Sequence, residues 1–301
     1  MLPHAPGIDS RHEHFLAVDY NKPVFDVYVD FAKYCIEAGL GLEILGYVCA
    51  PAASQIDYRP PPVAGEHAFP SWTPDWRIPN RIRPLNSTGL LHGEYRVLYD
   101  PCPKTKVAAV VSGLELGIQG FVFDTINSIV TTSGRQEIPV SNVLATWSAE
   151  LASTYGPIEK ERFWKLVLAD AYQIESEETG LTANARGGGE SRHLMGMDPA
   201  SLDYAYIWVR SQMHHALRGV CRDRRAGYTE AKRLAILPEA AVPGDLVAAF
   251  HGGHTLYVVR PIAREEKYTF VGECYVEDMM DGEVMTLATE NGIVPQTLWL
   301  V

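Results

Sequence analysis

The chain has 301 residues, and we expect a single domain over 1–301 with 1–230 and 231–301 as its subdivisions. Apolar residues make up 47% of the chain and charged residues 21%, which is typical of a soluble globular protein and excludes a disordered or fibrous one. The formal net charge of −11 opposes binding to nucleic acid or to an anionic membrane surface, so we expect neither as a partner.

The N-terminal third combines a predicted helix with long irregular stretches. The helix begins at Pro23, a residue suited to the first helical turn, and Gly39 ends it. Residues 42–48 are predicted to form a buried strand. Residues 51–103 are rich in proline and have no regular periodicity, which is typical of a segment that wraps a surface or shapes a site. The next predicted strand covers 114–129.

Helices are predicted in the middle of the chain. Residues 140–154 and 158–174 show helical periodicity on either side of a Gly-Pro break, and the polar stretch 175–192 predicts a loop. Residues 199–225 predict a long amphipathic helix. Its C-terminal end carries four arginines that suit the helix dipole, namely Arg218, Arg222, Arg224 and Arg225.

The C-terminal part is predicted to be a sheet. Gly252-Gly253 indicates a hairpin turn between two apolar runs. The expected strands cover 234–237, 245–250, 255–260 and 268–276. The resulting fold class is α+β, with helices packed on an antiparallel sheet and a small, barrel-like β-rich portion at the C-terminus.

Several kinds of protein are disfavoured by what the sequence lacks. It has no apolar run of the roughly 18 residues that a membrane-spanning helix needs, and its N-terminus does not resemble a signal peptide. The five cysteines are scattered and never spaced Cys-x-x-Cys, which argues against a disulfide framework or a zinc site. We therefore expect a cytoplasmic protein.

A rigid aromatic segment provides the first candidate for ligand binding. Trp72, Asp75 and Trp76 lie between prolines, and the two indole rings could form the wall of an apolar pocket. The same residues could instead act as a structural clamp, with Asp75 bonded to nearby backbone groups.

Histidines provide a second group of candidates. The pair His251 and His254 flanks the Gly-Gly turn, but two histidines without a third ligand make a poor metal site, so no metal is expected. His251 stays a candidate for substrate binding. The adjacent residues His214 and His215 point to different faces of their predicted helix, and His214 is the one that we take to face a pocket.

The third group of candidates lies near the C-terminus and comprises Arg260, Glu273 and Tyr275. Glu273 and Tyr275 share one face of a predicted strand because side chains alternate. A carboxylate beside a phenol could bind a polar group or transfer a proton, and Arg260 could donate a hydrogen bond. The alternative is a buried Arg–Glu pair with a purely structural role, completed by Tyr275.

Motifs for common cofactors are missing from the sequence. It contains no Gly-x-Ser-x-Gly elbow, no phosphate-binding Gly-x-x-x-x-Gly-Lys and no Gly-x-Gly-x-x-Gly after a predicted strand. If the protein is an enzyme, we therefore expect it to work without a cofactor.

Four stretches in a shared order carry a resemblance to a known family. They are residues 18–24, 70–76, 120–126 and 243–283, the last of which includes Pro243-Gly244-Asp245 and Val271-Gly272-Glu273-Cys274-Tyr275. Together they resemble the region downstream of the HET domain in fungal heterokaryon-incompatibility proteins. We expect the chain to begin beyond the HET domain, which is held responsible for the death response in that family, so the resemblance does not imply the family's toxicity.

Two functions follow from this resemblance and from the missing motifs. In the first, a HET-like protein recruited to natural-product biosynthesis acts on a small apolar metabolite, a terpenoid or polyketide, as an intramolecular cyclase such as a Diels–Alderase. In the second, it is a non-catalytic binding or regulatory module. Met1 and the 301-residue body favour a self-sufficient protein, and hence the enzyme.

Overall fold

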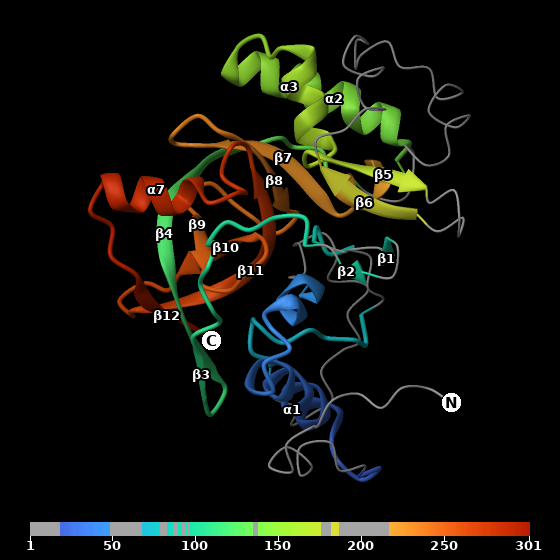
Figure 1. Cartoon of the computed structure of the whole chain (residues 1–301). Coiled ribbons are helices and arrows are strands. Elements are labelled where there is room, and N and C mark those ends of the chain that lie inside the picture. The colour runs from blue at the N-terminus through green and yellow to red at the C-terminus, as the bar shows by residue number, and fades with distance from the viewer. Residues whose placement is uncertain are drawn as a thin grey trace.

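A computed structural model describes residues 19–48, 68–78, 83–86, 90–91, 94–95, 97–134, 138–175, 182–186 and 217–301. These residues form a barrel-like antiparallel sheet with helices on its outside, which confirms the predicted α+β class (Figure 1).

Two long strands organise the barrel, and the remaining strands connect them. On one side, the antiparallel hairpin β9–β10 joins β4 to β11. On the other side, β7–β8 join the two long strands at one end and β12 joins them at the other. The contact between β12 and β11 is parallel and only two residue pairs long, so the ring is not evenly closed. The strands are β3 (Ala109–Ser112), which pairs with β4, then β4 (Glu115–Ile129), β7 (Arg224–Thr229), β8 (Leu234–Pro238), β9 (Leu246–Phe250), β10 (Leu256–Pro261), β11 (Lys267–Val276) and β12 (Gln296–Leu300).

Helices and two short ribbons surround this sheet. Figure 1 shows α2 and α3 at the end of the barrel near β7 and β8, whereas α1 lies at the opposite end near β3. The helices are α1 (Val24–Glu37), the 3-10 helix η2 (Glu43–Tyr47), α2 (Val140–Tyr155), α3 (Lys160–Val167) and α7 (Glu283–Glu290). The ribbons are β1–β2 (Leu90–Leu91 and Glu94–Tyr95) and β5–β6 (Ala171–Glu175 and Thr182–Arg186).

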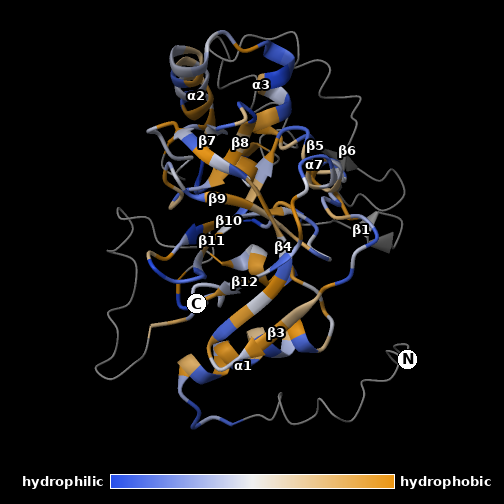
Figure 2. Ribbon diagram, turned by 90° about the vertical axis from the view of Figure 1, so that its left-hand side faces the viewer, coloured by the Kyte–Doolittle hydropathy of each residue, from blue (hydrophilic) through white to orange (hydrophobic). Residues whose placement is uncertain are grey.

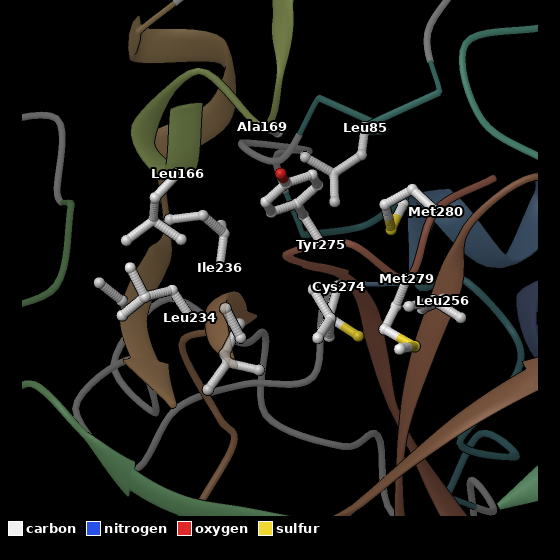
Figure 3. Close-up of a cluster of buried hydrophobic side chains, with 14 of the residues drawn as sticks. Leu85, Leu166, Ala169, Leu234, Ile236, Leu256, Cys274, Tyr275, Met279 and Met280 are labelled. Carbon is white, nitrogen blue, oxygen red and sulfur yellow. The ribbon is translucent and has the colours of Figure 1, made fainter. Parts of the chain in front are cut away.

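Both faces of the β9–β10 hairpin are buried, because side chains alternate along a strand and each face has its own apolar cluster. One face packs with α2, α3 and β8, and the other packs with α1, η2 and β12. The first face carries Val247, Ala249, Leu256 and Val258, and the second carries Ala248, Phe250, Tyr257 and Val259. Figure 2 shows that hydrophobic residues concentrate on the strands of the barrel, and Figure 3 shows part of the first cluster.

Many predicted elements are confirmed. The first helix, the strand at 114–129, the helix at 140–154 and the four C-terminal strands agree with α1, β4, α2 and β8 to β11 within a few residues. The hairpin at Gly252-Gly253 is also confirmed. Strands from both sides of residue 230 share the ring, and the subdivision of the domain there stays a prediction.

The predicted strand at 42–48 is wrong, because these residues form the 3-10 helix η2. The segment is a short apolar run, and periodicity alone cannot distinguish such a run in a strand from one in a short helix. Its apolar side chains still enter the core, since Ile44 and Leu45 are buried beside the barrel.

Two predicted helices are too long. α3 ends at Val167, because Ala169 and Asp170 adopt positive φ angles of 50° and 53° and turn the chain into β5. The helix predicted at 199–225 does not include Arg224, the first residue of β7, and Asp223 makes the turn before it with a φ of 51°. Only 217–221 of this segment is helical within the described residues. The predicted loop at 175–192 contains strand β6, and its other residues from 176 onward lie outside the described ones.

No helix among the described residues has the length and apolar character that crossing a membrane requires.

Candidate functional site

A cavity of about 240 Å³ lies on the outside of the barrel, where η2 and the segment 83–86 cover β10 and β11. It opens beside the turn between β9 and β10. The residues of its wall that matter chemically are Glu43, Gly46, Pro84, His254, Tyr257 and Glu273.

Glu273 is the central polar residue of this cavity. Its side chain is only 4% exposed, and Oε1 accepts hydrogen bonds from the Leu85 backbone N–H and from Arg224 Nη2, the latter at 2.7 Å. Burial away from water raises the pKa of Glu273 to about 7, although Arg224 and the Leu85 N–H oppose this rise by stabilising the charged form. The carboxyl group can therefore gain or lose a proton near neutral pH.

Arg224 holds this carboxyl group in place from the side of β7. The guanidinium group is 1% exposed and donates to the backbone carbonyls of Gly219 at 3.1 Å, Val220 at 3.2 Å and Arg83 at 2.8 Å. It thus joins the helical turn 217–221, the segment 83–86 and strand β11. Such a buried ion pair is bound tightly because both of its members are also hydrogen-bonded elsewhere.

Gly46 brings η2 close to Glu273. A Cβ atom at this position would lie 3.1 Å from Glu273 Oε2 and 3.1 Å from Pro84 Cβ, which is closer than ordinary van der Waals contact. Gly46 does not have the positive φ that would require glycine for conformational reasons. It is therefore the space beside Oε2 that a side chain here would fill.

The rim and floor of the cavity add further polar groups. His254 Nε2 lies 3.5 Å from Glu43 Oε1 at the partly exposed rim. Tyr257 is buried and stacks on Phe250 with ring centroids 4.6 Å apart. Burial, together with the charges of Glu273 and Glu43, raises the pKa of Tyr257 well above its usual value. Tyr257 therefore stays a neutral phenol.

The predicted catalytic pair Glu273 and Tyr275 has only one member in the cavity wall. Tyr275 is 1% exposed and packs against Tyr99, with ring centroids 6.3 Å apart. Figure 3 shows it in the apolar cluster that also contains Leu85 and Met280. Tyr275 thus contributes to the core behind the cavity.

Arg260, the third predicted catalytic residue, lies away from the cavity and binds Asp245. Its Nε and Nη2 atoms donate to the two carboxylate oxygens at 2.7 and 2.9 Å, and Nη2 also donates to the Ala240 carbonyl at 2.9 Å. The structural alternative of a buried Arg–Glu pair is present in the molecule, but the partner of Glu273 is Arg224 rather than Arg260.

The aromatic segment forms a clamp between α1 and the sheet. Trp72 is fully buried, and its Nε1 donates to a backbone carbonyl in the β3–β4 turn at 3.0 Å. Trp76 packs edge-on against Tyr28 of α1, with centroids 4.9 Å apart. Asp75 forms an ion pair with Arg77, with two distances of 2.9 Å. None of the three segment residues lines the cavity.

The two histidines at the β9–β10 turn, His251 and His254, have different surroundings. His251 packs edge-on against Phe121 with centroids 5.3 Å apart, and burial lowers its pKa. It is not part of the cavity wall, whereas His254 is. His214 lies outside the described residues. Among the described residues, no group of three or more His, Cys, Asp and Glu could hold a metal ion.

Sequence reasoning missed several residues of the site, chiefly Arg224, Gly46 and Tyr257. Arg224 was assigned to a helix end, and nothing in the sequence links it to a glutamate 49 residues later. For Gly46 there was a signal, because a glycine within an apolar run can mark a close approach of the backbone to another element.

Comparison with known proteins agrees with the barrel. Residues 193–293 match the family model of the Het-6 beta-barrel domain. The chain is also similar to "Heterokaryon incompatibility protein 6, OR allele" of Neurospora crassa, at 39% identity over 133 residues. That match covers 44% of this chain but only 17% of the relative's length. No solved structure matches. The resemblance to fungal heterokaryon-incompatibility proteins that the sequence indicated is thereby confirmed.

Proposed function

We propose that the protein is a cofactor-independent enzyme that cyclises or isomerises a small, largely apolar metabolite in the cavity at Glu273. The observation that supports this proposal is a buried carboxyl group in the cavity wall whose pKa is raised to about 7. A group with this pKa is suited to both accepting and donating a proton at neutral pH.

The cavity can contribute in two ways. Leu42, Pro84 and the ring of Tyr257 offer apolar surface against which a substrate folds, and correct orientation alone can lower a barrier by several kcal/mol. In an isomerisation Glu273 then transfers a proton to or from the folded substrate, whereas a Diels–Alder cyclisation transfers no proton and depends on the orientation of the substrate. The volume of about 240 Å³ lies below the roughly 300–1,000 Å³ of most ligand pockets, which favours a small substrate.

A Diels–Alder cyclisation of a terpenoid or polyketide is the particular reaction that we propose within this class. Its basis is the analogy drawn from the sequence. The arrangement of the site removes Arg260, Trp72 and Trp76 from the groups that would touch such a substrate, and leaves Glu273. We also propose a cytoplasmic location, which the free thiols of Cys35, Cys102, Cys221 and Cys274 support.

Two observations favour the second candidate function, a binding or regulatory module. The relative that matches is a heterokaryon incompatibility protein, and the pair of Arg224 and Glu273 also serves to join three segments of the fold. In this reading the cavity would be incidental, and a protein partner would be recognised elsewhere.

A metabolite extract from a fungal strain that lacks this gene provides the test. Deletion should let the substrate accumulate, and a fraction that contains it should raise the melting temperature of the purified protein by mass action. The same fraction should be converted by the wild type and by Glu115→Gln, a charge-matched control on the surface. It should be converted much more slowly by Glu273→Gln. A thermal shift without conversion would refute the enzyme, and a protein partner recovered by pull-down would then support the module. Equal rates in all three proteins would remove Glu273 from the mechanism.

A further inference from the structure

We infer that the ligand of this cavity carries a protonated amine, which binds Glu273 Oε2 in the space that Gly46 leaves open. This inference rests on the proposed function only in taking the cavity as the binding site. It adds the chemical class of the ligand and a residue that determines specificity.

The two carboxylate oxygens of Glu273 are used unequally. The Leu85 N–H and Arg224 both donate to Oε1, and no donor among the described residues reaches Oε2. A carboxylate has about four acceptor sites, so Oε2 can still accept hydrogen bonds from a ligand in the cavity that Glu273 lines.

The described part of the wall is acidic. Its lining residues include two carboxylates, Glu43 and Glu273, and no lysine or arginine among the described residues. The Arg224 guanidinium lies on the Oε1 side and already has four acceptors. A cationic group entering the cavity meets two acidic groups, whereas an anionic group is repelled by both.

Gly46 leaves the space beside Glu273 Oε2 open. Because Gly46 has no positive φ, alanine is conformationally acceptable at this position. A methyl group there would nonetheless lie 3.1 Å from Oε2 and compete with any ligand atom for that oxygen. Position 46 therefore controls access to Oε2, and the absence of its side chain is what lets an ammonium group reach the carboxylate.

Three probes that share one ring and differ in one polar group test the inference by isothermal titration calorimetry near neutral pH. They are benzylammonium, benzyl alcohol and benzoate. We expect benzylammonium to bind at least about tenfold more tightly than benzyl alcohol, because its hydrogen bond to the carboxylate is charge-assisted, and benzoate not to bind. Equal affinities for the first two, binding of benzoate, or no binding of benzylammonium up to its solubility limit would overturn the inference.

Two variants locate the probe. Glu273→Gln should lower the affinity for benzylammonium by roughly tenfold or more, and Gly46→Ala should do the same while the circular dichroism spectrum and cooperative melting are retained. The surface control Glu115→Gln removes the same charge as Glu273→Gln and should leave the affinity unchanged. If Gly46→Ala is folded and binds benzylammonium as the wild type does, the assignment of position 46 is wrong.

Different results would overturn the amine site and the proposed enzyme. Tight binding of benzylammonium with no conversion of any metabolite fraction would retain the amine site and refute the enzyme. Conversion of a substrate that has no amine would retain the enzyme and overturn the amine site.

Discussion

The buried carboxyl group of Glu273 should make the stability of the protein fall as the pH rises towards neutrality. The perturbation that reveals this is Glu273→Gln, which keeps the shape of the side chain and removes its titration. Burial raises the pKa of Glu273 to about 7, compared with 4.5 for an unperturbed glutamate. The native state therefore binds a proton that the unfolded state releases, over the range between these two values.

The sign and size of the effect follow from this difference. The stabilisation from a raised pKa is fully present below pH 4.5 and is lost as the pH rises through about 7. Between about pH 5 and about pH 8, the wild type should lose about 2 to 3 kcal/mol of unfolding free energy relative to Glu273→Gln. The unpaired charge that the variant leaves on Arg224 adds a penalty that does not change over this range, because arginine stays charged.

Urea denaturation followed by tryptophan fluorescence at several pH values measures this difference. Groups that titrate equally in both proteins cancel, and the raised pKa values of Tyr257 and Cys274 keep these neighbours neutral throughout. A difference in unfolding free energy that is constant from about pH 5 to about pH 8 would refute the reasoning. It would mean that Arg224 holds Glu273 ionised over the whole range.

Three further predictions concern residues around the site. Arg224→Met should lower the unfolding free energy by about 3 to 5 kcal/mol in urea titrations, because it leaves Glu273 buried without its charged partner. The control Lys267→Met, which breaks the surface pair with Glu115, should have no measurable effect. Trp72→Phe should lower the unfolding free energy by about 1 to 3 kcal/mol in the same assay, because it removes the indole hydrogen bond. It should leave the affinity for benzylammonium unchanged, and a large loss of affinity would mean that Trp72 contacts the ligand. The described cysteines should react with Ellman's reagent only as fast as the protein unfolds. Burial raises the pKa of Cys102 and of Cys221 to about 12, and it also raises the pKa values of Cys35 and Cys274. Rapid labelling of more than one of the five thiols at neutral pH would contradict this prediction.

The sequence was informative where a pattern is local. The helix starting after Pro23 and the hairpin at Gly252-Gly253 depend on nearby residues, and both are present. Elements whose ends are set by tertiary contacts were harder to predict. The arginines at 224 and 225 suit the end of a helix, but Arg224 is the first residue of β7 and pairs with Glu273 on β11.

The site was only partly predictable for the same reason. Glu273 was found through the strand that carries it and through the family resemblance. Its neighbours in the cavity come from η2, the segment 83–86 and the turn before β10, and no spacing rule connects these segments. Arg260 and the tryptophans were reasonable candidates by residue type, but each is occupied by a structural contact.

The way in which β12 closes the barrel has a consequence for how the protein is made. Strand β4 pairs with β7, β9 and β12, so its edges are complete only when the chain has been synthesised to residue 300. The N-terminal helix α1 emerges from the ribosome long before that point. Until β12 emerges, the nascent chain exposes the edge of β4 at residues 116–120, and such an edge can pair with another chain. The barrel therefore forms only after residues 296–300 have left the ribosome, and a stalled or truncated product that lacks β12 should depend on chaperones to stay unaggregated.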